Sequence, residues 1–125
     1  MKKAIALLLA LVMVFALCAC GGGGDSASGE KVVKIGVFEP ASGDSGAGGK
    51  KEMLGMQYAN QETPTVEIGG ETYKVELVYS DNGSDSAKAV SAASKLVNEK
   101  VSLVLGSYGS GVSIAASDTF KQAGI

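Results

Sequence analysis

The amino-acid sequence predicts an α/β fold with a doubly wound, Rossmann-like and mostly parallel sheet. Short runs rich in β-branched residues alternate along the chain with segments whose apolar residues recur at helical spacing. Loops rich in glycine and serine follow the first and the last of these runs. The resulting order of strand, helix, hairpin, helix, strand and helix is typical of the opening of a doubly wound sheet. We expect this fold to occupy residues 32–125.

A secretory leader precedes the fold. Lys2 and Lys3 are followed by an unbroken apolar run from Ala4 to Leu17, and small residues come directly behind it. The run is too short and wrongly flanked for a membrane-spanning helix, but it has the basic start and the length of a signal peptide. We therefore expect residues 1–19 to be removed and the mature protein to lie outside the cytoplasmic membrane.

The end of this leader resembles a bacterial lipobox. In such a signal the chain is cut before a cysteine whose thiol and new amine are both acylated, and Leu17-Cys18-Ala19-Cys20 makes Cys20 that residue. Several acyl chains, at about 0.8 kcal/mol per buried methylene, give an essentially permanent anchor. A plain secretory signal is the alternative, whereas acylation of Cys18 would put the bulky Leu17 where a small residue is wanted. Residues 20–31 are then a lipidated cysteine and a flexible tether.

The composition excludes several classes of function. The sequence has no His, no Trp and only two Cys, and all 11 of its basic residues are Lys. Without His, neither a Ser-His-Asp triad nor a zinc site of the usual kinds can form. The mature chain keeps nine Lys against 13 acidic residues, a net charge of −4, and without Arg it is a poor nucleic-acid binder. We expect a monomer that is not an enzyme and that holds no cofactor and no metal.

The first strand and the first helix come next along the chain. Val32–Phe38 is a short β-branched run, as expected of a buried parallel strand. After a loop that reaches Gly49, residues 50–61 are predicted to form a helix that ends before Pro64. Its broad apolar side consists of Met53, Leu54, Met56 and Tyr58.

A hairpin and a second helix follow. Residues 65–68 and 72–79 alternate between apolar and polar side chains, and Gly69-Gly70 between them tolerates the positive φ of a tight turn. The second helix is capped by Ser84 or Asp85. Its core-facing stripe at the i, i+3, i+4, i+7 spacing is Ala89, Ala92, Ala93 and Leu96.

The last strand and the last helix complete the pattern. Val101–Leu105 is predicted to be a buried strand, and a helix that Gly124 ends follows the loop at residues 106–111. The apolar stripe of this helix is Val112, Ala115, Ala116 and Phe120.

Two glycine-rich loops compete as functional sites. The stretch from Gly43 to Lys51 looks like a phosphate loop, but Asp44 takes the place of its first glycine and Lys51 stands where Ser or Thr should bind magnesium. The dinucleotide fingerprint fails as well, because Lys51 also occupies the position of its third glycine. A flexible turn that lines a cleft is the better interpretation of this loop.

The loop before the last helix is the stronger candidate. Ser110 is predicted to be the N-cap, so its hydroxyl lies beside the unpaired amides of the Val112 and Ser113 turn, at the carboxyl end of a central strand. A helix start offers N–H donors and a partial positive charge, which together favour a carboxylate without any Arg. The alternative is that Ser110 only caps the helix and that Ser113 is a solvated residue of its first turn.

Residues 31–125 resemble the first lobe of the type I periplasmic binding proteins, within the branched-chain amino acid and amide group of ABC-importer receptors. The order of the motifs carries the resemblance more than any single one. The motifs are Ile35-Gly36-Val37, Ala41-Ser42-Gly43, Leu54-Gly55, Val78-Tyr79-Ser80-Asp81, residues 92–98, the loop 104–110, and Ala116-Ser117-Asp118.

The resemblance implies a binding site. In such receptors a serine hydroxyl and backbone amides hold the ligand carboxylate, at positions that are Tyr108, Gly109, Ser110 and Ser113 in this sequence. An aromatic residue often found in the loop after the first strand is Gly48 here. The acidic group for the ligand ammonium comes from a second lobe, so the chain is interpreted as the amino-terminal part of a longer protein.

The implied function is capture of an amino acid of the branched-chain type, or of an amide, for an ABC importer. The partners are then the small-molecule ligand, the permease subunits and, through the lipid anchor, the membrane. Two alternatives remain: an extracytoplasmic ligand-sensing lobe of a signalling system, and an inactive truncated lipoprotein.

Overall fold

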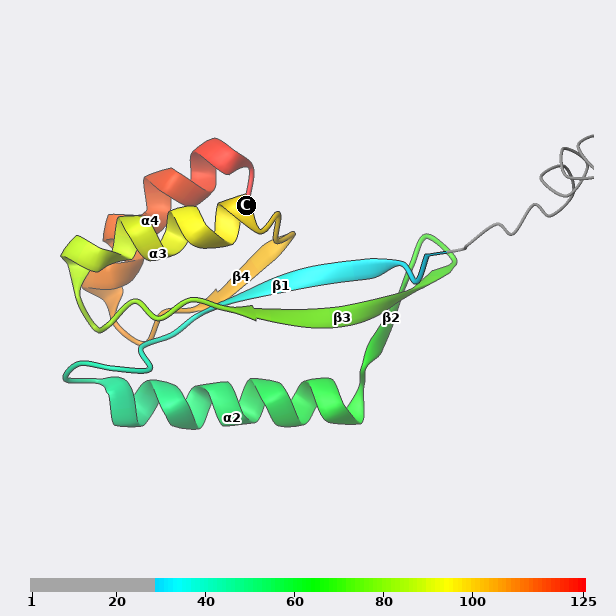
Figure 1. Cartoon of the computed structure of the whole chain (residues 1–125), viewed down its shortest axis with the longest axis horizontal. Helices are drawn as coiled ribbons and strands as arrows, with labels where there is room; N and C mark the ends of the chain where they lie inside the picture. Colours follow the sequence, from blue (N-terminus) through cyan, green and yellow to red (C-terminus); the bar gives the residue numbers. More distant parts are fainter. Residues whose placement is uncertain (1–28) are drawn as a thin grey trace, which may run out of the picture.

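The computed structural model describes residues 29–125, and Figure 1 shows how its elements are arranged. The expected signal peptide, Cys20 and most of the tether lie outside these residues. Within the described part, no helix has the length and apolar character needed to cross a membrane. The elements are β1 (Val32–Phe38), α2 (Gly46–Glu62), β2 (Thr65–Ile68), β3 (Glu71–Tyr79), α3 (Ser86–Asn98), β4 (Leu103–Gly106) and α4 (Ser110–Ala123).

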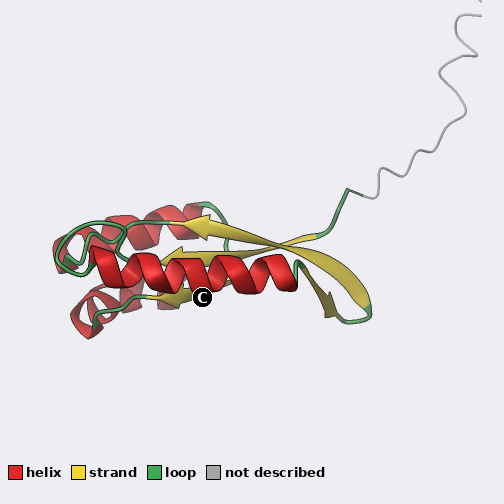
Figure 2. Ribbon diagram, turned by 90° about the horizontal axis from the view of Figure 1, so that it is seen from below, coloured by secondary structure: helices red, strands yellow, loops and turns green. Residues whose placement is uncertain are grey.

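The strands form one sheet with helices on both of its faces, which confirms the predicted doubly wound α/β class. The strand order is β2-β3-β1-β4, where β1 pairs in parallel with β3 and β4, and β2 pairs antiparallel with β3. Helices α3 and α4 lie on one face, and α2 runs along the other (Figures 1 and 2). The carboxyl ends of the three parallel strands therefore meet at one edge of the sheet.

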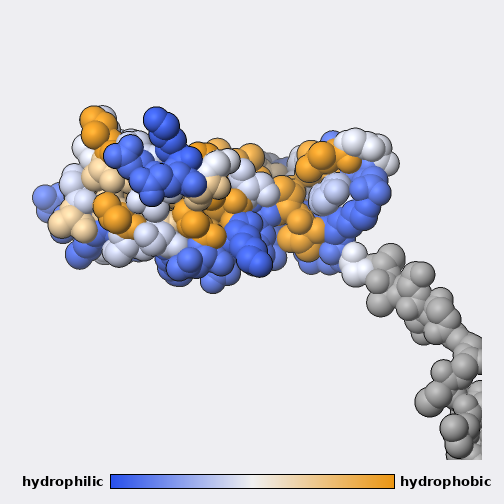
Figure 3. All heavy atoms as spheres, turned by 90° about the horizontal axis from the view of Figure 1, so that it is seen from above, coloured by the Kyte–Doolittle hydropathy of each residue, from blue (hydrophilic) through white to orange (hydrophobic). Residues whose placement is uncertain are grey.

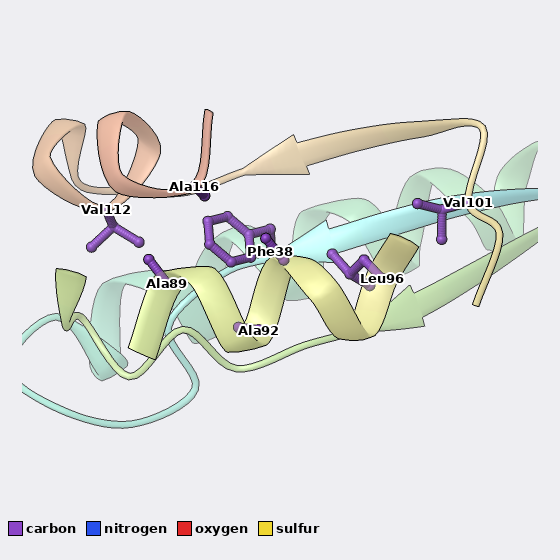
Figure 4. Close-up of a cluster of buried hydrophobic side chains, with 8 residues drawn as sticks. Phe38, Ala89, Ala92, Leu96, Val101, Val112 and Ala116 are labelled. Atoms are coloured by element: carbon purple, nitrogen blue, oxygen red, sulfur yellow. The ribbon is translucent and has the colours of Figure 1, made fainter. Parts of the chain in front are cut away.

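The main core lies between α3, α4 and the sheet (Figure 4). All four residues of the stripe predicted for α3 are buried, and Leu96 is completely so. Phe38 from β1 meets Phe120 from α4 edge to face, with ring centroids 5.5 Å apart. A Cβ on Gly36 would lie 3.0 Å from Val104 and 3.1 Å from Leu96, so glycine lets α3 and β4 approach β1 closely.

Local signals in the sequence place the ends of α3 and α4. Asp85 is the N-cap of α3, and its Oδ1 accepts a hydrogen bond of 2.7 Å from the amide of Ala87. Gly124 ends α4 in the left-handed conformation, with φ of 75°. The two-residue hairpin turn is also confirmed, since Gly69 and Gly70 both have positive φ.

Helix α2 begins at Gly46, four residues earlier than predicted. Glycine disfavours a helix interior, so the sequence argued for a loop here. The contacts explain the difference: a Cβ on Gly49 would collide with the backbone and ring of Pro40, so only glycine allows this turn to lie against the end of β1. The predicted apolar side is also wrong in part, because Leu54 and Tyr58 are 63% and 64% exposed.

An apolar groove of about 750 Å³ separates α2 from its face of the sheet. Met56 and Ala59 line it from the helix, and it extends along this face of the sheet from the hairpin to Leu105 near the end of β4. Figure 3 views the opposite side, where apolar and hydrophilic side chains are interspersed over α3 and α4. The sheet residues that line the groove are Val33, Ile35, Val66, Ile68, Val75, Leu77, Leu103 and Leu105.

Strand β4 differs from the predicted strand in its start and its burial. It begins at Leu103, while Val101 is buried in the core just before it. Leu103 and Leu105 are 43% and 40% exposed, because β4 is an edge strand of the described sheet and these two side chains face the groove. The prediction of a central, buried strand is therefore wrong for residues 29–125.

The last residues of the predicted tether contact the sheet. The carbonyl of Lys31 accepts a hydrogen bond of 2.8 Å from the amide of Lys74, and Lys31 forms an ion pair with Glu71. Glu30 pairs with Lys74 at 3.3 Å. These exposed pairs contribute little stability, but they fix where the chain enters β1.

Candidate functional site

Three loops meet at the carboxyl edge of the sheet, and they form the candidate ligand site. They follow β1, β3 and β4, and the third leads directly into α4. In parallel sheets with helices on both faces, ligands bind at this edge. The site is therefore built from residues 39–45, 80–85 and 106–113.

The start of α4 offers the predicted hydroxyl of Ser110 as a donor, but its free backbone amides are not the ones predicted. Gly109 is the N-cap and Ser110 the first helical residue, so the prediction that Ser110 caps the helix is wrong. Gly109 has extended backbone angles, which leave its carbonyl aligned with the helix. Within residues 29–125 no protein partner is assigned to the Ser110 hydroxyl, and the amides of Ser110 and Gly111 are the unpaired donors of a first turn.

Ser113 forms hydrogen bonds within this loop through its amide and its hydroxyl. Its amide and that of Val112 each donate to the carbonyl of Gly109 at 3.1 Å. Its hydroxyl lies 2.7 Å from the hydroxyl of Ser107, which is 5% exposed and donates to the Gly109 carbonyl at 3.0 Å. The amide of Ser113 is thus used within the first turn of α4, whereas a ligand contact of its hydroxyl, on an exposed residue, stays a prediction.

Tyr108 lies in the loop that leads into α4, and its side chain contacts α2. It has a positive φ of 65°, which is uncommon for a residue with a side chain, and 55% of it is exposed. A Cβ on Gly48 would lie 2.5 Å from two ring carbons of Tyr108 and 2.6 Å from its hydroxyl. The ring thus lies against the first turns of α2.

Asp81 ties the loop after β3 to the loop after β1. Its Oδ1 accepts the amides of Ala41 and Gly83 at 2.8 Å each and that of Ser42 at 3.3 Å, while its Oδ2 accepts the hydroxyl of Ser42 at 2.6 Å. Burial acts to raise the pKa of Asp81, but the hydrogen bonds from Ser42, Gly83 and Ala41 outweigh it and hold the pKa below its ordinary value. Both oxygens of the carboxylate accept hydrogen bonds from these donors, so Asp81 belongs to the framework of the site.

Asn82 joins all three loops. It is completely buried, and its Nδ2 donates to the carbonyl of Phe38 at 2.9 Å and to that of Ser107 at 3.5 Å. Its Oδ1 accepts the amide of Ser84 at 3.0 Å, and the hydroxyl of Ser84 accepts the amide of Ser45 at 3.0 Å. A buried and fully used amide of this kind fixes the relative position of the loops.

The exposed groups of the site suit a small anion with an apolar part. Ser110 and the amides at the start of α4 supply donors and the positive end of a helix dipole. Tyr108, in the same loop, supplies an exposed aromatic surface. Sequence reasoning proposed Tyr108, Gly109 and Ser110 as ligand residues, and the structure places them in the loop before α4 and at its start. It missed the framework of Asp81, Asn82 and Ser107.

The missed framework left a weak signal in the sequence. Asp81-Asn82 follows β3 after a single intervening residue, Ser80, and polar residues at the ends of parallel strands gather at one edge of a sheet. The partners, however, lie about 40 residues away, at Ala41 and Ser42. No local spacing reveals such pairs.

Comparison with known proteins gives consistent matches. A family model for periplasmic binding proteins matches residues 32–125. A Leu/Ile/Val-binding protein homolog 2 from Brucella abortus is 32% identical over 93 residues, which are 74% of this chain and 25% of that protein. The chain thus spans about a quarter of the length of the curated relatives it matches.

Solved structures agree with the sequence relatives. The leucine binding protein LivK from Thermotoga maritima has a TM-score of 0.66 at 35% identity, over 74% of this chain and 25% of that one. The branched-chain amino acid substrate binding protein LivJ from Streptococcus pneumoniae, solved with isoleucine, has a TM-score of 0.66 at 34% identity, over 76% and 27%. The chain belongs to the periplasmic binding protein family, as part of a type I member of its branched-chain amino acid group.

Proposed function

We propose that this chain forms part of the first lobe of an extracytoplasmic substrate-binding lipoprotein of an ABC importer. The protein captures an amino acid of the branched-chain type, or a related amide, when two lobes close over it in the full-length protein. The observation that carries the proposal is the start of α4. There the Ser110 hydroxyl and two backbone amides are free donors on exposed residues, two positions after the exposed Tyr108.

The chemistry of these groups supports a ligand with a carboxylate. The donors neutralise an anion without a basic side chain, which suits a chain that has no Arg. The related LivJ was solved with isoleucine, and a solute binding protein from R. palustris at 27% identity was solved with benzoate. Both of those ligands have a carboxylate and an apolar part, which is the pairing that Ser110 and Tyr108 offer.

The predicted leader supports a location of the protein outside the cytoplasmic membrane. Acylation of Cys20 anchors the mature chain to the outer face of the membrane, and residues 21–31 give the lobe reach above it. At that position the loaded receptor meets the permease subunits of the importer. The protein then has no catalytic task of its own, and its contribution is capture and delivery.

Isothermal titration calorimetry of the full-length protein tests the proposal. The panel consists of L-leucine, L-isoleucine, L-valine, L-leucinamide, benzoate and D-glucose. We expect at least one of the amino acids or the amide to bind with a Kd on the order of 1 μM or tighter, and glucose not to bind. A folded protein that binds glucose and none of the other compounds contradicts the proposal.

A further inference from the structure

Asn82 and Gly83, in the loop after β3, form a chemically labile pair. The backbone nitrogen of a glycine can attack the side-chain amide carbon of a preceding asparagine, because glycine has no side chain to hinder the approach. The bond from that carbon to the side-chain nitrogen breaks, and the side-chain NH2 leaves as ammonia with the proton of the attacking nitrogen. Water then opens the resulting succinimide ring to aspartate or to isoaspartate.

The sequence has two other asparagines, and neither precedes a glycine. Asn60 is followed by Gln61, and Asn98 is followed by Glu99. The long side chains of Gln and Glu hinder the approach that Gly83 allows. Asn82 is therefore the expected point of reaction among residues 1–125 when the chain is unfolded.

The folded structure restrains both reacting groups. The amide of Gly83 donates to Oδ1 of Asp81 at 2.8 Å. That nitrogen has to lose its proton before it attacks, and the negative charge of Asp81 beside it disfavours the loss. Asn82 is completely buried, and the hydrogen bonds of its Nδ2 and Oδ1 hold its side-chain amide in place. The reaction therefore requires the loop to open.

The architecture of the site requires both residues of the labile pair. The side chain of Asn82 donates to two carbonyls through its NH2 group and accepts an amide through its oxygen, which a carboxylate cannot do. Gly83 has a positive φ of 63°, a conformation that residues with a side chain disfavour. The geometry that joins the loops thus brings a labile bond with it.

Conversion of Asn82 removes the contacts that join the three loops. An aspartate has no NH2 group, so its carboxylate would face the carbonyls of Phe38 and Ser107 as a buried, unpaired charge. Isoaspartate also lengthens the main chain by one carbon, which displaces Gly83 relative to Asp81. The ammonia is not regained, so the change is permanent.

We propose that Asn82-Gly83 is a latent deamidation site, at which an unfolded chain loses the amide that holds the ligand loops together, and that the folded chain suppresses this reaction through Asp81. Molecules that stay unfolded before or after export therefore lose the ability to build the site. The reaction and its effect on stability are independent of the proposed function, whereas its effect on ligand binding rests on it.

Peptide mapping by mass spectrometry of the full-length protein tests the proposal. The protein is held either folded or in urea at the same mildly alkaline pH, and conversion of each asparagine is followed over time. In urea we expect Asn82 to convert faster than Asn60 and Asn98. In the folded protein its conversion should be at least about a hundredfold slower, because only molecules with an open loop react. Equal rates in both states, or an Asn82 no faster than the other two in urea, overturn the proposal.

Asp81→Ala tests the protective role of the carboxylate. In the folded variant Asn82 should convert about tenfold faster than in wild type or more, and in urea at the same rate. Asp44→Ala, at an exposed acidic residue of the loop after β1, is the matched control and should keep the wild-type rate. If circular dichroism shows Asp81→Ala to be unfolded, Asp81→Asn keeps an acceptor without the charge and should show a smaller increase. A folded Asp81 variant with the wild-type rate overturns the role of Asp81.

Asn82→Asp tests the consequence of the modification. We expect its Tm to lie about 10 °C below that of the wild type, because the new carboxylate is buried without donors. A variant that melts with the wild type overturns the claim that deamidation damages the site.

Addition of L-leucine to the folded wild type then tests the link to the ligand. Saturating leucine should slow the conversion of Asn82 about tenfold or more, because it binds the molecules whose loops are closed. Tight leucine binding with an unchanged rate overturns this link. Absence of leucine binding counts against the proposed function, and the peptide maps and melting curves still decide the deamidation site.

Discussion

The ring of Tyr108 lies against the backbone of Gly48, where a Cβ would come within 2.5 Å of two ring carbons. This contact joins α2, which follows the first strand, to the loop before α4. It also fixes an aromatic surface in the same loop that leads to Ser110. The absence of a side chain at position 48 thus leaves the space that the ring at position 108 occupies.

Replacement of Gly48 by Ala should separate stability from binding. The new methyl group pushes the ring of Tyr108 away, which is easy because the ring is the exposed end of a flexible side chain. Alanine also favours the helix by up to about 1 kcal/mol. We therefore expect an unchanged or higher Tm and a leucine affinity that falls about tenfold, measured by melting and calorimetry on the same samples.

Gly55→Ala is the matched control for this substitution. Gly55 lies on the same helix, and nothing stands within 4 Å of a Cβ there. This variant should gain stability from the same change in helix propensity and bind leucine as the wild type does. Equal affinity losses in both variants would show that α2, and not the ring of Tyr108, is responsible.

Ser110→Ala should weaken ligand binding without destabilising the fold. A hydrogen bond to a charged group contributes about 1.5–3 kcal/mol, so affinity should fall on the order of ten- to a hundredfold. Because Gly109 is the N-cap, the loss of the Ser110 hydroxyl removes no helix cap. Calorimetry with L-leucine measures the first effect, and urea unfolding measures the second.

Ser107→Ala should instead lower stability and affect ligand binding less. Its hydroxyl is buried between the Gly109 carbonyl and the hydroxyl of Ser113, so we expect a loss of about 1 kcal/mol in the free energy of unfolding. Binding should change less than in Ser110→Ala. If Ser107→Ala instead loses more affinity than Ser110→Ala at equal stability, the donor group of the site has been assigned to the wrong serine.

Asp81→Asn should weaken the loop framework most at neutral pH. Hydrogen bonds lower the pKa of Asp81, so its carboxylate stabilises the fold above the ordinary pKa, and this contribution is lost as the pH falls through the lowered value. Because Asp81 is exposed, we expect the loss at neutral pH to be only about 1–2 kcal/mol. Urea unfolding from about pH 7 to about pH 3 should show the difference from wild type shrinking; a difference that grows toward acid pH would be incompatible with this role.

Cys20→Ala should prevent lipid attachment. The variant is then released from the membrane or left unprocessed, whereas Cys18→Ala stays membrane-bound. Growth with a labelled fatty acid, followed by membrane fractionation, distinguishes the two. Label that is still incorporated after Cys20→Ala would rule out this cysteine as the anchor.

The parts of the fold that depend on local spacing could be predicted from the sequence. The stripe of Ala89 to Leu96 requires only helical periodicity, and Asp85 and Gly124 act within one turn of their own helix. The start of α2 could not be predicted in this way, because Gly48 and Gly49 are there for contacts with Tyr108 and Pro40. Local propensity argues against a helix at these glycines, and tertiary packing overrides it.

The candidate site, too, could be predicted only where it depends on the local sequence. The start of α4 followed from a glycine-rich loop before an amphipathic segment, although the N-cap lies one residue earlier than predicted. The roles of Asp81 and Asn82 could not be found, since each depends on partners from other elements. Such partners become visible only when the strands are placed in order.

The most direct measurement follows the amide resonances of Ser110 and Gly111 by NMR while L-isoleucine is added to the full-length protein. We expect both amide protons to shift strongly downfield, because they bind the ligand carboxylate at the start of α4. L-isoleucinol, which has an alcohol in place of the carboxylate, should produce much smaller shifts at these two amides. Isoleucine that binds tightly while both resonances stay in place would contradict the account and locate the anion site elsewhere.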